Sequence, residues 1–319
     1  MIMVVGRFAP SPSGYMHLGN AAVAALAWAS AKSRGGEIVL RVEDLDPARS
    51  RREFTEGIID DLRWLGLMWD RRAEDQSARG AAYDAALDRL RAKGLVYPCY
   101  CSRDELHAAS APHASDGRVI YAGTCRDLTP AQRAMKTKPP CLRARVPERE
   151  IAFVDGLQGE QRLSLSREWG DFIVRRADGV AAYQLAVVVD DAENGVTEVV
   201  RGRDLLSSTP AQLWLYEALG LKPPHFIHMP MLLAADGRRL SKRDGDLNLK
   251  NLRDRWPPEK VIGLIAWLYG LNDRWEDMSA GELAAVFSWE SVKHHGRGDI
   301  VLNVPKGTVL FDTSPEVKG

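Results

Sequence analysis

The sequence predicts an α/β protein whose open parallel sheet is split by an insertion of mixed structure. Three observations lead to this prediction. A short apolar run at residues 1–5 precedes a glycine- and proline-rich turn and an alanine-rich segment at residues 21–34, which indicates a strand, a loop and a helix. A second apolar run at residues 37–42 ends in an acidic cluster. Beyond a loop-rich and β-rich stretch, an apolar segment resumes near residue 181, so we expect the sheet in two halves.

Length and charge limit the classes of function that fit this chain. The 319 residues suffice for one large or two modest domains, and 43 basic and 43 acidic side chains give a net charge of +0. Bulk charge therefore gives no support for a nucleic-acid partner, and any RNA contact needs a local basic face. The sequence has no apolar run of membrane-spanning length and no basic leader with a cleavage site, so a cytoplasmic location is expected.

The first turn, residues 6–20, reads GRFAPSPSGYMHLGN. Its two prolines hold the loop open, and Gly14 and Gly19 allow the backbone to come close to a ligand. The helix that follows offers free N–H groups and the positive end of its dipole, which suits phosphate. The turn therefore predicts a phosphate-binding site. An ordinary strand–loop–helix with an incidental histidine, His17, is the alternative.

The second strand, residues 37–42, places an acidic cluster at its carboxyl end. In open α/β sheets that edge is where ligands bind. The carboxylate of Glu43 is suited to pair with the ammonium group of a substrate. A solvated acidic loop is the alternative interpretation of the same residues.

The insertion contains a candidate metal site. Three cysteines lie in its loop-rich part, at Cys99, Cys101 and Cys125. Three thiolates make a zinc site that lacks one ligand, and simple chemistry nominates His107 or His113 as the fourth. With four protein ligands such a site is structural, because no position is left for water. Unmetallated thiols are the alternative, and Cys141 is expected to be a bystander.

The second half of the chain is expected to alternate strands and helices. Residues 171–176 and 181–190 read as strands joined by a tight turn at residues 177–180, where an Asp-Gly pair favours a hairpin. A helix is expected at residues 209–220, with threonine and proline at its start and glycine at its end. Residues 225–233 read as the last buried strand.

A basic loop follows the last strand. Residues 239–243 read RLSKR, and the ammonium of Lys242 is suited to stabilise negative charge on a departing phosphate group. By itself the string also fits an ordinary basic surface loop. Helices are then expected at residues 258–269 and 279–287, and the polar tail with its apolar run at residues 300–304 is left unassigned.

These motifs resemble those of a known enzyme family. Residues 17–20, HLGN, are similar to the HIGH signature of class I aminoacyl-tRNA synthetases, and Asn20 in place of the final histidine keeps a hydrogen-bond donor. The string RFAPSPSG at residues 7–14 resembles the glutamate-specific branch of that class. Residues 239–243 resemble the second signature, KMSKS, with Lys242 at the position of its second lysine.

The resemblance extends over most of the chain and implies a Rossmann-type catalytic domain that is followed by a small helical stem-contact region. The expected divisions are the first half of the catalytic domain at residues 1–96, the insertion with the zinc site and β-hairpins at 97–180, the second half with the KMSKS-like loop at 181–246, and the stem-contact region with the tail at 247–319.

The resemblance also implies roles for individual residues. His17 and Lys242 would be catalytic. The residues that bind ATP would be His17, Gly19, Asn20, Ser241 and Lys242. The residues that bind glutamate would be Arg7, Ala9, Ser11, Glu43, Tyr183 and Arg201. Glu43 would hold the α-ammonium, and the two arginines would select the side-chain carboxylate, for which the guanidinium fork is better suited than lysine. Without the resemblance, Tyr183 reads equally as a core aromatic and Arg201 as a surface charge.

Two features are similar to the glutamyl-queuosine branch of this family. The chain leaves no room for the anticodon-binding domain of a complete glutamyl-tRNA synthetase, and Tyr121 stands at the position that makes it the fourth zinc ligand. This branch implies tRNA-independent activation of L-glutamate with ATP. The glutamate would pass to queuosine at the wobble position of tRNA(Asp), with the catalytic core docked on the anticodon stem-loop. One structural Zn²⁺ per chain, Mg²⁺ with ATP and a monomer are expected.

Two alternatives stay open. One is a truncated glutamyl-tRNA synthetase that charges a tRNA acceptor end, and the other is a non-catalytic paralogue that binds nucleotide or RNA. The joint presence of Arg7, Glu43 and Lys242 argues against the second, because a decayed site would have lost at least one of them. Glutamate-dependent pyrophosphate exchange in the absence of tRNA distinguishes the three possibilities.

Overall fold

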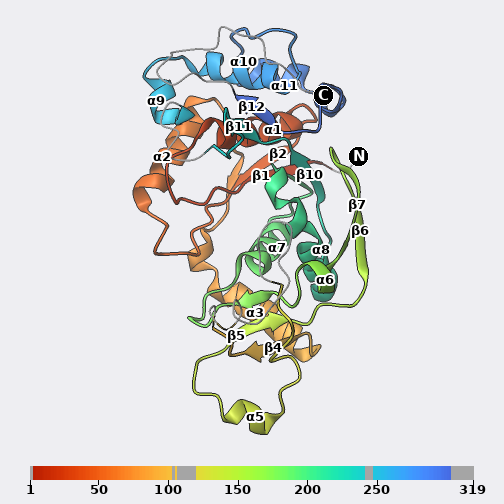
Figure 1. The fold of residues 1–319 in the computed structure, drawn as a ribbon. Helices are drawn as coiled ribbons and strands as arrows, with labels where there is room; N and C mark the ends of the chain where they lie inside the picture. Colours follow the sequence, from red (N-terminus) through yellow and green to blue (C-terminus); the bar gives the residue numbers. More distant parts are fainter. Residues whose placement is uncertain (1–2, 103–104, 106–119, 241–246, 303–319) are drawn as a thin grey trace.

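The computed structural model describes residues 3–102, 105, 120–240 and 247–302. The centre of the molecule is a set of parallel strands with helices packed around them (Figure 1). These strands are β1 (Val5–Phe8), β2 (Glu37–Leu40) and β3 (Arg71–Arg72) in one group, and β9 (Glu198–Gly202) and β10 (His225–Met229) in the other.

The two groups of strands meet at β1 and β9. The backbone N–H of Thr197 donates to the carbonyl of Val5, and the N–H of Val5 donates to Oγ1 of Thr197, both at 2.9 Å. The order across the molecule is therefore β3, β2, β1, β9 and β10. This confirms the expected α/β architecture with two parallel halves that come together across the insertion.

Helices cover these strands on both sides. They are α1 (Leu18–Lys32), α2 (Arg52–Trp64), α3 (Gly80–Ala92), α7 (Tyr183–Glu193) and α8 (Thr209–Leu219), with short 3₁₀ helices η1 (Gln76–Ala78) and η2 (Arg203–Ser208). α1 packs on β1 and β9, and its alanines at positions 21, 22, 25 and 29 are fully buried. Small side chains on this helix allow its backbone to lie close to the strands, so the alanine-rich composition sets the spacing between them.

The first strand begins later than the apolar run predicts. We expected it at residues 1–5, but it begins at Val5, and Met3 is 51% exposed. The reason is the buried Arg7, which pairs in register with Val39 of β2 and lies inside the strand. A prediction based on runs of apolar residues does not extend a strand through a charged residue, even where that residue is buried.

The segment at residues 181–190 is a helix, so the strand predicted there is wrong. Ala181 forms a single bridge with Arg175, and α7 begins directly afterwards at Tyr183. All residues from Gln184 to Asp191 are buried, because α7 packs against α3 and α8 as well as the core. A helix without a polar face shows no helical period, and its run of valines favours a strand by propensity alone.

The insertion forms its own β-structure, which occupies one end of the molecule and extends along one side of it (Figure 1). Its elements are the antiparallel strands β4 (Val96–Cys99), β5 (Cys141–Ala144) and β8 (Ile173–Arg175), the hairpin of β6 (Glu150–Asp155) and β7 (Gly159–Ser164), and the short helices α5 (Pro130–Ala134) and α6 (Leu165–Glu168).

The β6–β7 hairpin returns to the parallel strands. The N–H of Gly156, at its turn, donates to the carbonyl of Phe226 in β10 at 2.9 Å. A Cβ atom at position 156 would lie 2.7 Å from Cγ1 of Ile227, so glycine permits this close approach. The insertion therefore contacts the parallel strands as well as its own sheet.

The C-terminal part of the described chain is mostly helical and lies at the opposite end from β4 and β5 (Figure 1). Its elements are β11 (Leu232–Ala234), α9 (Leu249–Arg253), α10 (Pro258–Leu268), α11 (Ala280–Val286), α12 (Trp289–His295) and β12 (Ile300–Leu302). β12 pairs in parallel with β11, which gives the unassigned apolar run a place in the fold. Within the described part of the chain, no helix has the length and apolar character that crossing a membrane requires.

Candidate active site

A cavity of about 570 Å³ opens at the carboxyl ends of β1, β2 and β9, beside the first turn of α1. Every described residue that we expected to bind glutamate or ATP lines it. These residues are Arg7, Ala9, Ser11, His17, Gly19, Asn20, Glu43, Tyr183 and Arg201. Tyr183 reaches the cavity from the first position of α7 instead of from a strand.

His17 and Asn20 fix the start of α1. Nδ1 of His17 accepts a hydrogen bond from the N–H of Asn20 at 3.3 Å, and Oδ1 of Asn20 accepts one from the N–H of His17 at 3.2 Å. This reciprocal pair is a capping box in which histidine replaces the usual serine or threonine. A Cβ atom at Gly19 would lie 3.0 Å from Cε1 of His17, so glycine leaves room for the imidazole.

Ser241 and Lys242 lie outside the described residues, as do His107 and His113. Leu240, the second residue of the KMSKS-like string, lines the cavity, and farther along the chain the N–H of Leu249 donates to the carbonyl of Met16 at 2.9 Å. The described residues on either side of 241–246 therefore lie close to the first signature.

Arg201 is a buried cation, with only 3% of the residue exposed. Its guanidinium donates to Nε2 of His228, Oε1 of Gln212 and Oγ1 of Thr209, each at 2.9 Å. No carboxylate of the described chain lies within 4.0 Å of it. Burial lowers the pKa of Arg201, and the nearby charge of Arg7 adds to this effect. The positive charge that Arg201 brings to the cavity thus lacks a close counter-charge.

Arg41 does not line the cavity, but it holds Glu43, which does. It is fully buried and donates to Oδ1 of Asp191 at 2.6 Å and to Oε1 of Glu43 at 3.0 Å. Arg7 lies 3.9 Å from the same Asp191 oxygen and donates to the carbonyl of Val200 at 3.0 Å. Burial raises the pKa of Glu43, and the charge of Arg41 opposes that shift. Glu43 is therefore held by a charged neighbour that points it into the cavity.

Sequence reasoning missed several residues that support the site. They are Arg41, Asp191, Thr209, Gln212, His228 and Asp155, which contact the lining residues from behind or through one another. One signal was available for some of them, since a charged or imidazole side chain inside an apolar strand must find buried partners. Which partners they find is a matter of tertiary contact and cannot be deduced from spacing.

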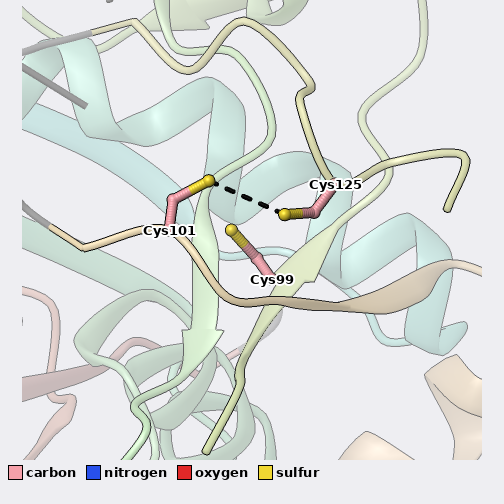
Figure 2. Close-up of side chains that lie close together, drawn as sticks. All are labelled: Cys99, Cys101 and Cys125. Carbon is pink, nitrogen blue, oxygen red and sulfur yellow. Dashed lines mark hydrogen bonds between the residues drawn. The ribbon is translucent and has the colours of Figure 1, made fainter. Parts of the chain in front are cut away.

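The three expected metal-binding cysteines lie together at the far end of the insertion. Figure 2 shows the sulfur atoms of Cys99, Cys101 and Cys125 pointing toward one another. All three sulfurs are within 4.8 Å of each other, and those of Cys101 and Cys125 are 3.6 Å apart. A tetrahedral zinc–thiolate site with bonds of about 2.3 Å separates its sulfurs by roughly 3.8 Å. The spacing of the cluster therefore fits this ion.

Tyr121 stands beside these thiols. Its hydroxyl lies 3.4 Å from Sγ of Cys99 and accepts the N–H of Cys125 at 2.7 Å, so a fourth donor atom is present at the cluster. Cys141 is a cross-strand neighbour of Cys99 and contacts it from one side. A hydrogen bond from Cys141 lowers the pKa of Cys99 to about 4, whereas burial raises the pKa of Cys101 to about 12.

Comparison with known proteins identifies the family of the chain. The family model described as "tRNA synthetases class I (E and Q), catalytic domain" matches residues 3–291. Two curated relatives carry the name Glutamyl-Q tRNA(Asp) synthetase. The relative from Symbiobacterium thermophilum is 52% identical, over 89% of this chain and 92% of its own. The relative from Nitratidesulfovibrio vulgaris is 49% identical, over 84% of this chain and 87% of its own.

Solved structures agree with the fold. A glutamate tRNA ligase from Elizabethkingia meningosepticum, solved in complex with its amino acid, has a TM-score of 0.79 and 27% identity, covering 93% of this chain and 67% of its own. A glutamate-tRNA synthetase from Elizabethkingia anophelis has a TM-score of 0.80 at 27% identity, with 93% and 68% covered. The chain therefore belongs to the class I tRNA synthetases of the glutamate and glutamine group, and within that group to the family of glutamyl-Q tRNA(Asp) synthetases.

Proposed function

We propose that this ATP-dependent ligase activates L-glutamate as glutamyl-adenylate and transfers the glutamate to queuosine at the wobble position of tRNA(Asp). One observation carries the first step. Arg201, a buried cation without a carboxylate within 4.0 Å among the described residues, faces the same cavity as the first turn of α1. An anionic amino acid supplies the missing charge, and the helix start accommodates the triphosphate.

The amino acid is held at both ends. Arg201 and Arg7 bind the side-chain carboxylate, for which the planar fork of arginine gives paired hydrogen bonds. Glu43, oriented by Arg41, receives the α-ammonium, and Tyr183 closes the wall between the two ends. Ala9 and Ser11, on the loop after β1, line the same region and complete the glutamate pocket.

ATP occupies the part of the cavity next to α1. His17, Gly19 and Asn20 contact its phosphates at the helix start, and Ser241 and Lys242 approach from the other side. This position is supported by Leu240, whose δ-carbon lies 3.9 Å from the Cβ position of Gly19. Lys242 follows Leu240 by two residues, a span of at most about 7 Å. Mg²⁺ accompanies ATP and is held mainly by phosphate oxygens.

No covalent enzyme intermediate is needed for activation. The α-carboxylate of glutamate attacks the α-phosphorus of ATP in line, and pyrophosphate leaves. The protein contributes orientation of the two reactants and stabilisation of the charge that develops on the phosphates. His17 and Lys242 supply this stabilisation from opposite sides.

The acceptor is proposed from the names of the relatives. The proteins from Symbiobacterium thermophilum and Nitratidesulfovibrio vulgaris are named for glutamyl-Q and tRNA(Asp), and this chain covers most of their length. The catalytic core would then dock on the anticodon stem-loop. A glutamyl-tRNA synthetase that charges an acceptor end is the competing function, because the solved structures of similar fold are named a glutamate tRNA ligase and a glutamate-tRNA synthetase.

The insertion, placed at residues 97–180, is proposed to hold one structural Zn²⁺. Cys99, Cys101, Cys125 and Tyr121 supply four donor atoms, which leaves no position for a catalytic water. The ion would tie the loop that carries Tyr121 and Cys125 to the end of β4. The remaining divisions are proposed as the two catalytic halves at 1–96 and 181–246 and the helical region with the tail at 247–319.

Glutamate-dependent exchange of pyrophosphate into ATP tests the first step. The expected result is exchange without any tRNA. Exchange only in the presence of tRNA(Glu) would support the competing synthetase, and ATP binding without exchange would support a non-catalytic paralogue. Transfer of labelled glutamate to tRNA(Asp) with queuosine, but not to queuosine-free tRNA(Asp), would then identify the acceptor nucleoside. A tRNA(Asp) that carries queuosine but lacks its 3′-terminal adenosine should still accept the glutamate.

A further inference from the structure

A chain of buried hydrogen bonds runs from the β6–β7 hairpin to the guanidinium of Arg201. Oδ2 of Asp155 lies 2.5 Å from Nδ1 of His228, and Nε2 of the same imidazole lies 2.9 Å from Nε of Arg201. The three residues expose 2%, 0% and 3% of their surface. Asp155 and His228 do not line the cavity, so they act from behind the residue that does.

The contacts fix the protonation of His228. Arginine has no acceptor, so its Nε–H must donate, and Nε2 of His228 must carry a lone pair. The ring proton is then on Nδ1, where it is donated to Asp155. Burial lowers the pKa of His228, which agrees with a neutral imidazole. The hydrogen bond from this histidine, against the effect of burial, lowers the pKa of Asp155.

The orientation of Asp155 is fixed as well. Its Oδ1 accepts three backbone N–H groups, from Leu157 at 3.0 Å, Gln158 at 2.9 Å and His228 at 3.2 Å. Only Oδ2 is left for the imidazole. The side chain of Gln158 also donates to the carbonyl of His228 at 2.9 Å, which ties the hairpin turn to β10.

The other edge of the guanidinium is held by Gln212 and Thr209 from α8, so neighbours on both sides determine where Arg201 points. The neutral imidazole adds no negative charge, and it separates the carboxylate of Asp155 from the guanidinium. The charge of Arg201 therefore remains available to a ligand in the cavity.

We propose that Asp155 and His228 are positioning residues for amino-acid selection, which hold Arg201 in its carboxylate-binding orientation through a single tautomer of the imidazole. This inference rests on the proposed function, because it assumes that Arg201 binds the side-chain carboxylate of glutamate. It makes the hairpin of the insertion a contributor to the specificity of a pocket that it does not touch.

Two substitutions at one position separate this role from a purely structural one. In H228N the amide nitrogen replaces Nδ1 and keeps the bond to Asp155, but Nε–H of Arg201 loses its acceptor. In H228Q the amide oxygen replaces Nε2 and keeps that acceptor. In glutamate-dependent pyrophosphate exchange, H228N should raise KM for glutamate about tenfold to hundredfold, the range expected for one lost hydrogen bond to a charged group. KM for ATP should stay near the wild-type value, and H228Q should retain most of the affinity for glutamate.

A third variant, D155N, reverses the tautomer without changing volume. The three backbone N–H groups keep the amide oxygen in place of Oδ1, so the amide NH₂ faces Nδ1 of His228. The ring proton must then move to Nε2, where it opposes Nε–H of Arg201. KM for glutamate should rise as in H228N, with a melting temperature close to that of H228Q. If H228N does not fold, the KM of D155N for glutamate tests the proposal in its place.

The outcomes are distinct. Absence of glutamate-dependent exchange by the wild-type protein would overturn the proposed function and this inference with it. Exchange by the wild type, with an equal KM for glutamate in H228N and H228Q, would overturn the inference alone. Equal increases of KM for glutamate and for ATP in D155N would also overturn it, because they would show general damage to the cavity.

Discussion

At the scale of single residues, the proposed selection of the amino acid depends on Arg201, which has no carboxylate within 4.0 Å among the described residues. Arg201 makes its close hydrogen bonds to uncharged acceptors, whereas Arg41 is paired with Asp191 and Glu43. Burying a charge is costly unless an opposite charge accompanies it. The same carboxylate that an amino acid brings to Arg201 would be redundant next to Arg41, so only one of these two buried arginines is suited to bind substrate.

We expect Arg201→Lys to weaken glutamate binding strongly. Lysine keeps the charge but lacks the planar fork, so it cannot hold His228, Gln212 and a carboxylate at once. KM for glutamate in pyrophosphate exchange should rise about tenfold to hundredfold. Arg203→Lys is the matched control, because Arg203 pairs with Asp299 at 2.7 Å and does not line the cavity. An equal effect of the two substitutions would contradict this role.

The pH dependence of stability should show a contribution from His228. Its pKa is lowered in the folded protein, chiefly by burial, from the ordinary value of 6.5. As the pH falls below about 6.5, the unfolded chain takes up a proton that the folded chain does not, so this residue lowers the free energy of unfolding by up to about 1.4 kcal/mol per pH unit. The groups that face it are Asp155 from β6, Arg201 from β9, Thr209 from α8 and the stacked ring of Phe226.

Thermal unfolding of wild type and H228Q between pH 7.5 and 5.5 measures this contribution. The wild-type melting temperature should fall more steeply toward low pH than that of H228Q. The other ionisable groups are common to both proteins, and the pKa of Asp155 is lowered from 3.8, so its own loss of stability falls below this range. Parallel curves for the two proteins would show that His228 titrates alike in the folded and unfolded states.

At the scale of secondary-structure elements, the sequence predicted the local motifs but not the residues that contact them in the folded protein. The turn before α1 and the acidic end of β2 identified His17, Asn20 and Glu43 as cavity residues, and the structure places all three there. α7 was predicted as a strand because its buried valines have no polar face to show a helical period. The pairing of His228 with Asp155, 73 positions earlier, depends on how a hairpin folds back, which no local pattern records.

The cluster of Cys99, Cys101 and Cys125 leads to a prediction at this scale. The purified protein should contain about one equivalent of zinc, and Cys125→Ser should lose it, because three thiolates and a phenol oxygen complete a tetrahedral site. Cys141→Ser is the matched control and should retain the metal, since Cys141 is not among the three mutually close sulfurs. Elemental analysis of both variants decides this.

A wild-type protein without zinc, or a Cys141→Ser variant that loses it, would contradict the proposed ligand set. Melting temperature in the presence of a chelator provides a second readout. The wild type should lose several degrees, whereas Cys125→Ser should be insensitive to the chelator. If both proteins respond equally, the chelator acts elsewhere on the molecule.

At the scale of the whole molecule, the end of the described chain returns to the cavity. Asp299 accepts the N–H of Met231 at 2.9 Å and pairs with Arg203, and Ile300 donates to the carbonyl of Met231 at 2.8 Å. Met231 lines the cavity. Residues that the sequence analysis left unassigned thus support the segment after β10, which forms part of the cavity wall.

A chain that ends at Gly298 should therefore be less stable than one that ends at Leu302. Loss of Asp299 and β12 removes hydrogen bonds to a charged group, and the free energy of unfolding should fall by about 2 kcal/mol or more. KM for ATP should rise in the same protein, because Met231 loses its supports. Denaturant unfolding and pyrophosphate exchange of both chains check this. Similar free energies of unfolding and similar KM values for ATP in the two chains would show that β12 has no such role.

The return of the β6–β7 hairpin to β10 has a consequence for how this enzyme could be rebuilt. Replacing residues 97–180 with the corresponding residues of a relative would affect more than the insertion itself. It would bring a foreign residue next to His228, behind Arg201, the arginine that we propose to bind the substrate. Engineers who wish to keep the preference for glutamate should therefore transplant Asp155 together with its turn, or leave both untouched.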